Sequence, residues 1–335
     1  MAIAFLLAVF VSFIATFFST PIFIRFLRRA GVVGTDVHKQ NKPLIPTSAG
    51  IPVAVGVIIA LMGYIFAKTF IYNNTSEVTL IFAAITAILL ITFIGFLEDV
   101  LHNRTRDREG DNRSTTGGLK KWQKPLMTLP AAIPFMVIAA GTTTLALPFI
   151  GNINFGILYP LLLIPLGVVG AANMVNLLGG LNGIEAGMGI VYTGMLGLYA
   201  WTAGANLAAL IAFATFGALI GVFYFNRYPA RILPGDSIQY LLGAVLVSIA
   251  VLGNIEKAVV IAALPFFIEF ILKLRGKLQK KTIGFLNKNG KVQSKYEKIY
   301  SLPHIWMRSG KWTEKQIVIF MMLIELGFAS LIWFI

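Results

Sequence analysis

The sequence has no cysteine and few acidic residues. Its 335 residues include 14 Asp and Glu against 28 Lys and Arg, which gives a formal net charge of +14. The absence of cysteine excludes disulfides and thiol chemistry. Charged residues make up only 13% of the chain and hydrophobic residues 57%, a balance that excludes an ordinary soluble protein. The apolar runs also lack the alternating polar residues that the strands of a membrane β-barrel require.

Long apolar runs are what the sequence has instead. Each is roughly 17 to 25 residues long, enough for a helix to cross about 30 Å of hydrocarbon. We therefore expect an all-α polytopic membrane protein, with residues 1–335 forming a single integral membrane domain of about ten transmembrane helices. The expected spans are residues 3–26, 49–71, 79–98, 124–143, 156–174, 185–203, 206–225, 237–253, 257–273 and 315–335.

The connections between successive spans should alternate between the two sides of the membrane. Basic residues gather in the connections of one side. Of the 28 Lys and Arg, 26 fall in four segments that would share that side, namely residues 25–42, 104–124, 227–231 and 273–315. Only Lys68 and Lys257 fall on the other side. Because Lys and Arg accumulate in cytoplasmic loops, we expect both termini outside and five cytoplasmic loops inside. The protein would be integral to a plasma membrane or an ER-type membrane. Its charge would also contact anionic membrane lipids, and we expect no nucleic-acid partner.

Acidic and amide side chains end or interrupt the apolar runs on that same side. They are Glu98 and Asp99, Asn176 and Asn182, and Asp236. Carboxylates are costly to hold in a membrane, so several of them at one aqueous face indicate a site. Carboxylate and amide oxygens are the hard ligands that suit Mg²⁺, with Mn²⁺ as an alternative ion. Acids that could hold a cation, beside many basic residues, favour a phosphate-rich substrate.

Some of these features also have a structural interpretation. Asp236 precedes an apolar run and could simply cap a helix N-terminus. The glycines of residues 173–187 could serve close helix packing, although packing does not explain the three amides in that segment. Glu98 and Asp99 are expected at a helix C-terminus, where the dipole disfavours acids, so Mg²⁺ or Lys124 should compensate them.

The last basic segment, residues 273–315, could close over this acidic site. It has twelve Lys and Arg against two Glu and could clamp a pyrophosphate. Lys280, Lys281 and His304 are candidate contacts to substrate. A structural role for the lone His304 is the alternative.

Four motifs, taken in order, give the chain a family resemblance. It resembles the polyprenyl-phosphate N-acetylhexosamine-1-phosphate transferases, of glycosyltransferase family 4 type, over nearly its full length. It is most similar to the dolichyl-phosphate GlcNAc-1-phosphate transferase branch of archaea and eukaryotes. The motifs are Ile45-Pro46-x-Ser48-x-Gly50, Gly95-Phe96-x-x-Asp99-Val100-Leu101, Asn176-x-Leu178-x-Gly180-x-Asn182-Gly183-x-Glu185-Ala186-Gly187 and Asn226-x-Tyr228-Pro229-x-Arg231-x-x-x-Gly235-Asp236.

The resemblance implies roles for individual residues. Asp236 and Asn176 match the Mg²⁺ ligands of the family, and Lys124 matches a lysine that engages phosphate. Asp99 matches the second acid of a paired-aspartate motif, whereas Glu98 is one methylene longer than the first. Catalytic roles are therefore expected for Asp99, Glu98 and Lys124. Substrate contacts are expected from Asn182, which matches the uracil-binding position, and from Glu185, Gly187, Arg231, Lys280, Lys281 and His304.

The implied reaction joins a UDP-sugar to a dolichyl or polyprenyl phosphate on the cytoplasmic face. N-acetylglucosamine-1-phosphate would pass from UDP-GlcNAc to the lipid phosphate, and UMP would leave. Alternative substrates are another UDP-N-acetylhexosamine or a UDP-muramyl-pentapeptide. A secondary transporter is a remote alternative, since no internal repeat is visible and the acids lie at one face. A homodimer is one expected assembly.

Overall fold

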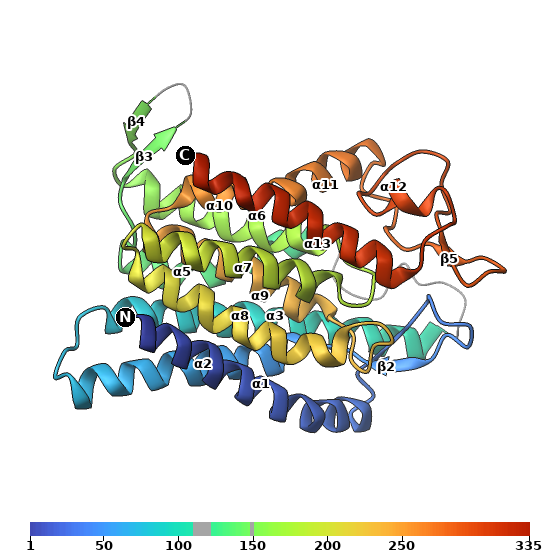
Figure 1. Cartoon of the computed structure of the whole chain (residues 1–335), viewed down its shortest axis with the longest axis horizontal. Helices are drawn as coiled ribbons and strands as arrows, with labels where there is room; N and C mark the ends of the chain where they lie inside the picture. Colours follow the sequence, from blue (N-terminus) through green and yellow to red (C-terminus); the bar gives the residue numbers. More distant parts are fainter. Residues whose placement is uncertain (110–121, 148–150) are drawn as a thin grey trace.

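The computed structural model describes residues 1–109, 122–147 and 151–335, and these residues form a bundle of helices (Figure 1). Side chains are described outside residues 102–121 and 147–150. The α-helices are α1 Ala2–Arg29, α2 Gly50–Phe66, α3 Val78–Glu109, α4 Gln123–Thr128, α5 Ile133–Val137, α6 Ile164–Leu177, α7 Ile184–Thr202, α8 Asn206–Asn226, α9 Gly235–Gly253, α10 Glu256–Ala262, α11 Leu264–Arg275, α12 His304–Met307 and α13 Glu314–Ser330.

Short elements extend or connect these helices. The π or 3₁₀ turns are η1 Ala67–Ile71, η2 Leu129–Ala132, η3 Tyr159–Leu163 and η4 Leu331–Phe334. Six short strands pair as three antiparallel hairpins: β1 Val33–Thr35 with β2 Leu44–Pro46, β3 Thr144–Leu147 with β4 Gly151–Asn154, and β5 Phe285–Leu286 with β6 Val292–Gln293. The described chain is therefore mostly helical, as expected.

Seven helical segments of the described residues are long and apolar enough to cross a membrane. They are Ala2–Arg29, Gly50–Ile71, Val78–Leu101, Tyr159–Leu177, Asn206–Asn226, Gly235–Gly253 and Glu314–Phe334. Helix also occupies the three other expected spans, but two of them are broken at prolines. One consists of α4, η2 and α5, with breaks at Pro130 and Pro134, and the other consists of α10 and α11, with a break at Pro265. The third, α7, carries Glu185 in its first turn. The protein is an integral membrane protein, and the number of ten spans stays a prediction.

Helix α9 lies at the centre of the bundle. Helices α3, α6 and α8 pack on it, and 83% of its most apolar 18-residue window is buried. Its N-terminal turn, which begins at Gly235, is therefore surrounded by other elements. The backbone N–H of the buried Ser237 in that turn must find a partner within the protein.

Parts of two basic segments lie at one end of the bundle. Figure 1 shows both chain termini and the β3–β4 hairpin at one end, and the β1–β2 hairpin, β5 and α12 at the other. Strand β1 lies in the basic segment 25–42, and β5 and α12 lie in the basic segment 273–315. This arrangement agrees with an even number of crossings. Residues 110–121, in the second basic segment, lie outside the described residues.

One expected helix end is wrong. We expected Glu98 and Asp99 to lie at a helix C-terminus. Helix α3 instead continues to Glu109, so both acids lie in its interior. The reason is that partners from other elements satisfy both carboxylates, and the helix has no need to end there.

The predicted sidedness can be tested directly, because the chain has no native cysteine. Asn74→Cys and Asn289→Cys each place a thiol on an exposed loop residue. An impermeant maleimide should label the Asn74→Cys protein from outside the cell, and the Asn289→Cys protein only after the membrane is opened. Labelling of both variants from the same side of the intact membrane would overturn the topology.

Candidate active site

A polar cavity of about 400 Å³ lies where the β1–β2 hairpin, α3, α4, the α6–α7 connection and the start of α9 meet. Seven residues singled out in the sequence line it. They are Glu98, Asp99, Lys124, Asn176, Asn182, Glu185 and Asp236. These side chains come from four segments far apart in the chain, and the structure gathers them around one space. Their individual roles stay predictions.

Lys124 joins two acids across this cavity. Its Nζ lies 3.1 Å from Oε1 of Glu98 on α3 and 2.9 Å from Oδ2 of Asp236 on α9. Asn176, near the end of α6, donates from Nδ2 to Oδ1 of Asp236 at 3.1 Å. Four helices, α3, α4, α6 and α9, thus meet through one ammonium and one amide. Lys124 therefore compensates Glu98, one member of the expected acid pair, and its second acidic partner is Asp236.

Asp99 stabilises the N-terminus of α9 from another helix. Its carboxylate accepts a hydrogen bond from the Ser48 hydroxyl at 2.6 Å and from the backbone N–H groups of Asp236 at 2.8 Å and Ser237 at 3.4 Å. The first N–H groups of a helix have no partner within it, and the helix dipole favours a negative charge there. Asp236 does not cap its own helix, which overturns that alternative, so its side chain is available to Lys124 and Asn176.

Glycines allow these elements to come so close. A Cβ on Gly95 would lie 2.6 Å from Cα of Ser237, and one on Gly50 would lie 2.4 Å from its carbonyl carbon. Helices α2 and α3 therefore both pack closely against the first turn of α9. Gly235 has a φ of +68°, and a Cβ there would meet the Asp99 carboxylate at 2.3 Å. The spacing of glycines in three of the sequence motifs has this physical basis.

A second buried network holds Asn182. Its Nδ2 donates to Oδ2 of Asp36 at 2.8 Å, and its backbone N–H donates to Oε1 of Glu314 at 2.7 Å. Nδ1 of His38 lies 3.1 Å from the same Glu314 oxygen, and Nε2 of His38 accepts from the Gly284 N–H at 3.3 Å, so Nδ1 is the donor to Glu314. The network joins four distant segments at the position expected to bind uracil.

Sequence reasoning identified Asn182 but missed three other members of this network. Asp36 and His38 stand close together in the first basic segment, and Glu314 begins α13. The side chains of all three are at most 3% exposed. The available signal was a cluster of polar residues in a loop beside an apolar span. Only the fold shows that these loops meet.

Glu185 stabilises the α6–α7 connection. Its Oε1 accepts from Nε2 of Gln239 at 3.0 Å and from the Gly180 N–H at 3.3 Å. Glu185 is 5% exposed, although it lines the cavity. The predicted interruption between two apolar helices is confirmed at residues 178–183. Glu185 holds that interruption against α9.

Five predicted contacts do not line this cavity. Gly187 lies where α7 packs against α13, and a Cβ on it would lie 2.9 Å from Sδ of Met322. The ammonium of Lys280 lies 5.1 Å from the Tyr296 ring centroid, and the Lys281 N–H donates to the Tyr296 hydroxyl at 3.4 Å. Arg231 lines a separate cavity, and His304 is in the protein interior.

The geometry favours the structural alternative for His304. Its side chain is fully buried, Nδ1 accepts from the Tyr300 N–H at 3.3 Å, and Nε2 lies 3.1 Å from the Thr282 carbonyl oxygen. Burial lowers the pKa of His304, and the nearby Lys273 charge lowers it further. A neutral imidazole that bridges two loop segments fits these observations.

Asp236 and Asn176 could hold a Mg²⁺ ion that substrate phosphates also bind. The Asp236 carboxylate and the Asn176 side-chain amide converge at the cavity wall and offer hard oxygens. Among the described residues no group of three or more His, Cys, Asp and Glu could hold a metal. Mg²⁺ needs no such cage, because it usually keeps waters and is held by one or two carboxylates plus substrate phosphates. The residues present therefore fit the ion that the resemblance implies.

Comparison with known proteins identifies the family. The fold and cavity define an integral membrane protein with a site of acids, amides and one lysine at one end of its helices. The glycosyl transferase family 4 model matches residues 80–254. A protein of Saccharolobus solfataricus, provisionally named UDP-N-acetylglucosamine–dolichyl-phosphate N-acetylglucosaminephosphotransferase, is 32% identical over 98% of this chain and 95% of its own. The chain belongs to glycosyl transferase family 4.

Two further relatives cover almost the whole chain. A Sulfolobus acidocaldarius protein with the same provisional name is 30% identical over 97% of this chain and 94% of its own. A phospho-N-acetylmuramoyl-pentapeptide-transferase of Geobacillus is 29% identical over 97% of this chain and 95% of its own. The resemblance found from the motifs is confirmed.

The two neighbouring acids should differ in their response to neutralisation. Asp99→Asn places an amide nitrogen opposite an N–H group of α9 and removes a charged acceptor. The loss should weaken the interaction of residue 99 with α9 by roughly 1.5–3 kcal/mol. We expect kcat/KM for sugar-phosphate transfer to fall about 10- to 100-fold. Glu98→Gln keeps an acceptor for Lys124 and should retain measurable activity. A Glu98→Gln protein that binds both substrates normally but has no detectable turnover would instead make Glu98 a general base.

Replacement of Glu314 should act through Asn182. Glu314→Ala leaves the Asn182 N–H and the His38 ring without their acceptor, so KM for the UDP-sugar should rise about tenfold or more. Glu314→Gln keeps an acceptor oxygen and serves as the control, with KM within about threefold of wild type. A Glu314→Ala protein that is less stable to heat but has an unchanged KM would contradict a positioning role.

Proposed function

We propose that this protein transfers N-acetylglucosamine-1-phosphate from UDP-GlcNAc to a dolichyl or polyprenyl phosphate. The products are UMP and a GlcNAc-diphospho-lipid, and the reaction would be the first membrane step of lipid-linked oligosaccharide synthesis. The observation that carries the proposal is the cavity in which Lys124 bridges Glu98 and Asp236 beside Asn176. The names of the two archaeal relatives support the choice of substrates.

Positioning and electrostatics would supply most of the catalysis. Asn182, held by Asp36 and Glu314, would orient the nucleoside. Asn176 and Asp236 would hold Mg²⁺, which when bound neutralises charge on the diphosphate and the departing UMP. The Lys124 ammonium would attract the phosphates.

The lipid phosphate needs no strong base to become a nucleophile. The second pKa of a phosphate monoester is near 6, so most of it is dianionic at neutral pH. One of its oxygens would attack the sugar-bearing phosphorus of UDP-GlcNAc, and the bond from that phosphorus to the UMP oxygen would break. Asp99 is already engaged with Ser48 and α9, which favours a role in holding the site together over proton removal.

The cavity is proposed to face the cytoplasm. It is formed partly by the β1–β2 hairpin, which begins in a basic segment and lies at the end of the bundle opposite both termini. Acids at one end of a bundle also differ from the broken helices near the bilayer midplane that transporters use. A UDP-muramyl-pentapeptide remains the second candidate substrate, because bacterial transferases of that substrate class are among the relatives.

An assay of the purified protein separates these candidates. With polyprenyl phosphate and a panel of UDP-sugars, UDP-GlcNAc should give the highest kcat/KM, with equal amounts of UMP and lipid product. EDTA should abolish turnover and Mg²⁺ should restore it. Asp236→Asn should remove most activity while the protein stays folded. Turnover only with the muramyl-pentapeptide substrate would reject UDP-GlcNAc as the substrate. Full activity of the metal-free enzyme would reject the proposed requirement for Mg²⁺.

A further inference from the structure

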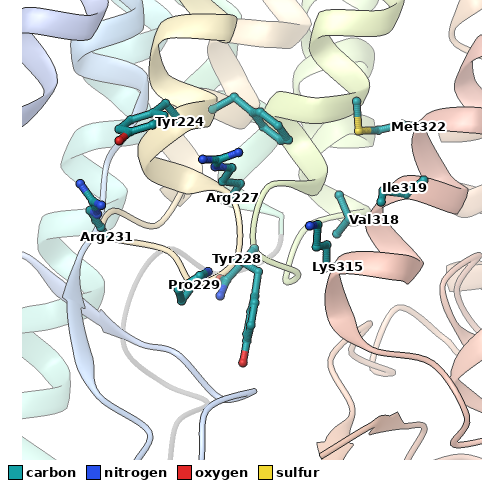
Figure 2. A pocket seen from close by; sticks show the side chains of 11 residues that line it. Tyr224, Arg227, Tyr228, Pro229, Arg231, Lys315, Val318, Ile319 and Met322 are labelled. Atoms are coloured by element: carbon teal, nitrogen blue, oxygen red, sulfur yellow. The ribbon is translucent and has the colours of Figure 1, made fainter.

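A second cavity lies on the other side of Asn182. It has a volume of about 540 Å³ and lies between the C-terminal end of α8, the connection to α9 and the first turns of α13. Figure 2 shows Arg227 between Tyr224 on one side and the α13 side chains Val318 and Met322 on the other. The cavity thus has a basic part and an apolar part.

Three basic side chains line this second cavity. They are Arg227, Arg231 and Lys315. Within the described residues no carboxylate lies within 4.0 Å of any of them. The guanidinium carbons of Arg227 and Arg231 lie 5.2 and 5.6 Å from the centroid of the Tyr224 ring. Like charges gathered around one cavity favour an anion, and the guanidinium fork is suited to phosphate.

The opposite wall continues into a surface suited to an acyl chain. Val318, Ile319 and Met322 line the cavity from α13. Ile319, Leu323 and Leu326, at successive turns of this helix, are 44%, 57% and 43% exposed. On a helix that can cross a membrane, such a stripe faces lipid. Lys315, in the first turn of α13, lies where basic side chains commonly meet lipid headgroups.

The cavity is separate from the proposed site of phosphoryl transfer. Asn182 lines both cavities, but its side chain is bonded to Asp36 and its N–H to Glu314, so it forms a wall between them. Lys124 and Asp236 line only the catalytic cavity. A phosphate held by Arg227 and Lys315 is therefore not the reacting one.

We infer that this cavity binds the phosphate headgroup of an anionic membrane phospholipid, with one acyl chain lying along α13. The phosphate would lie among Arg227, Arg231 and Lys315. The headgroup would supply negative charge beside these three cations. The lipid would also join α8 to α13 and so stabilise the folded state.

The test measures lipid binding to delipidated protein by native mass spectrometry. The probes are phosphatidylglycerol and, as a lipid of no net charge, phosphatidylcholine. The double variant Arg227→Gln/Lys315→Gln should lose about 25-fold in affinity for one phosphatidylglycerol, since each basic residue near the headgroup contributes roughly fivefold. Lys288→Gln/Lys311→Gln removes the same charge from exposed residues outside the cavity and should stay within about twofold of wild type.

A second measurement guards against a folding defect in the variant. Phosphatidylglycerol should raise the Tm of the wild type and the control, but not of the double variant, because only a lipid bound to the folded state stabilises it. If the double variant does not fold, Lys315→Gln alone should lose roughly fivefold in affinity. Unchanged phosphatidylglycerol affinity in the Arg227 and Lys315 variants, or an equal loss in the control, would overturn the inference.

Competition identifies the source of the phosphate. Neither excess inorganic phosphate nor polyprenyl phosphate should displace the bound phosphatidylglycerol. Displacement by inorganic phosphate would assign the cavity to a free anion. One-for-one displacement by polyprenyl phosphate would assign it to the substrate lipid, and either result would reject a membrane phospholipid as the occupant.

Discussion

The hydrogen bonds from the N-terminus of α9 to Asp99 are the interaction on which the site depends. A buried carboxylate without partners is strongly destabilising, and so are the unpaired N–H groups of a buried helix end. Each satisfies the other here, and Ser48 adds a third hydrogen bond. Because Asp99 is on α3 and Ser48 precedes α2, one carboxylate sets three elements in register. Asp236 is thereby directed to Lys124 and Asn176.

The charge of the catalytic cavity has a consequence for its substrates. Glu98 and Asp236 share the ammonium of Lys124, and three further acids, Asp36, Asp99 and Glu185, also line the cavity. Such a site would repel a diphosphate in the low dielectric of a membrane protein unless a cation accompanied it. A divalent ion shared between Asp236 and substrate phosphates would resolve this conflict. The wider basic surface at the same end of the bundle would attract the anionic substrates electrostatically.

The sequence was informative where polar residues interrupt apolar ones. Carboxylates and amides are costly in hydrocarbon, so Asn176, Asn182 and Asp236 could be found as site candidates before their fold was known. The helical class and the approximate ranges of the spans followed from the length of the apolar runs.

Residues whose partners are distant in the chain could not be assigned in the same way. Glu314 was only one of two Glu in the basic segment 273–315, and its role depends on contact with Asn182 and His38. His304 looked like a substrate contact, but its ring nitrogens bond to its own loop segment. The end of α3 was misplaced because a helix can continue past two acids when other elements supply their partners.

The central claim is direct attack by the lipid phosphate, with the acids as electrostatic and positioning groups. It is tested most directly by exchange of labelled UMP into UDP-GlcNAc in the absence of lipid phosphate. The account predicts no exchange until the GlcNAc-diphospho-lipid product is added, when the reverse reaction should incorporate the label. Incorporation without any lipid would contradict the account, because it requires a covalent sugar-phosphate intermediate on the enzyme.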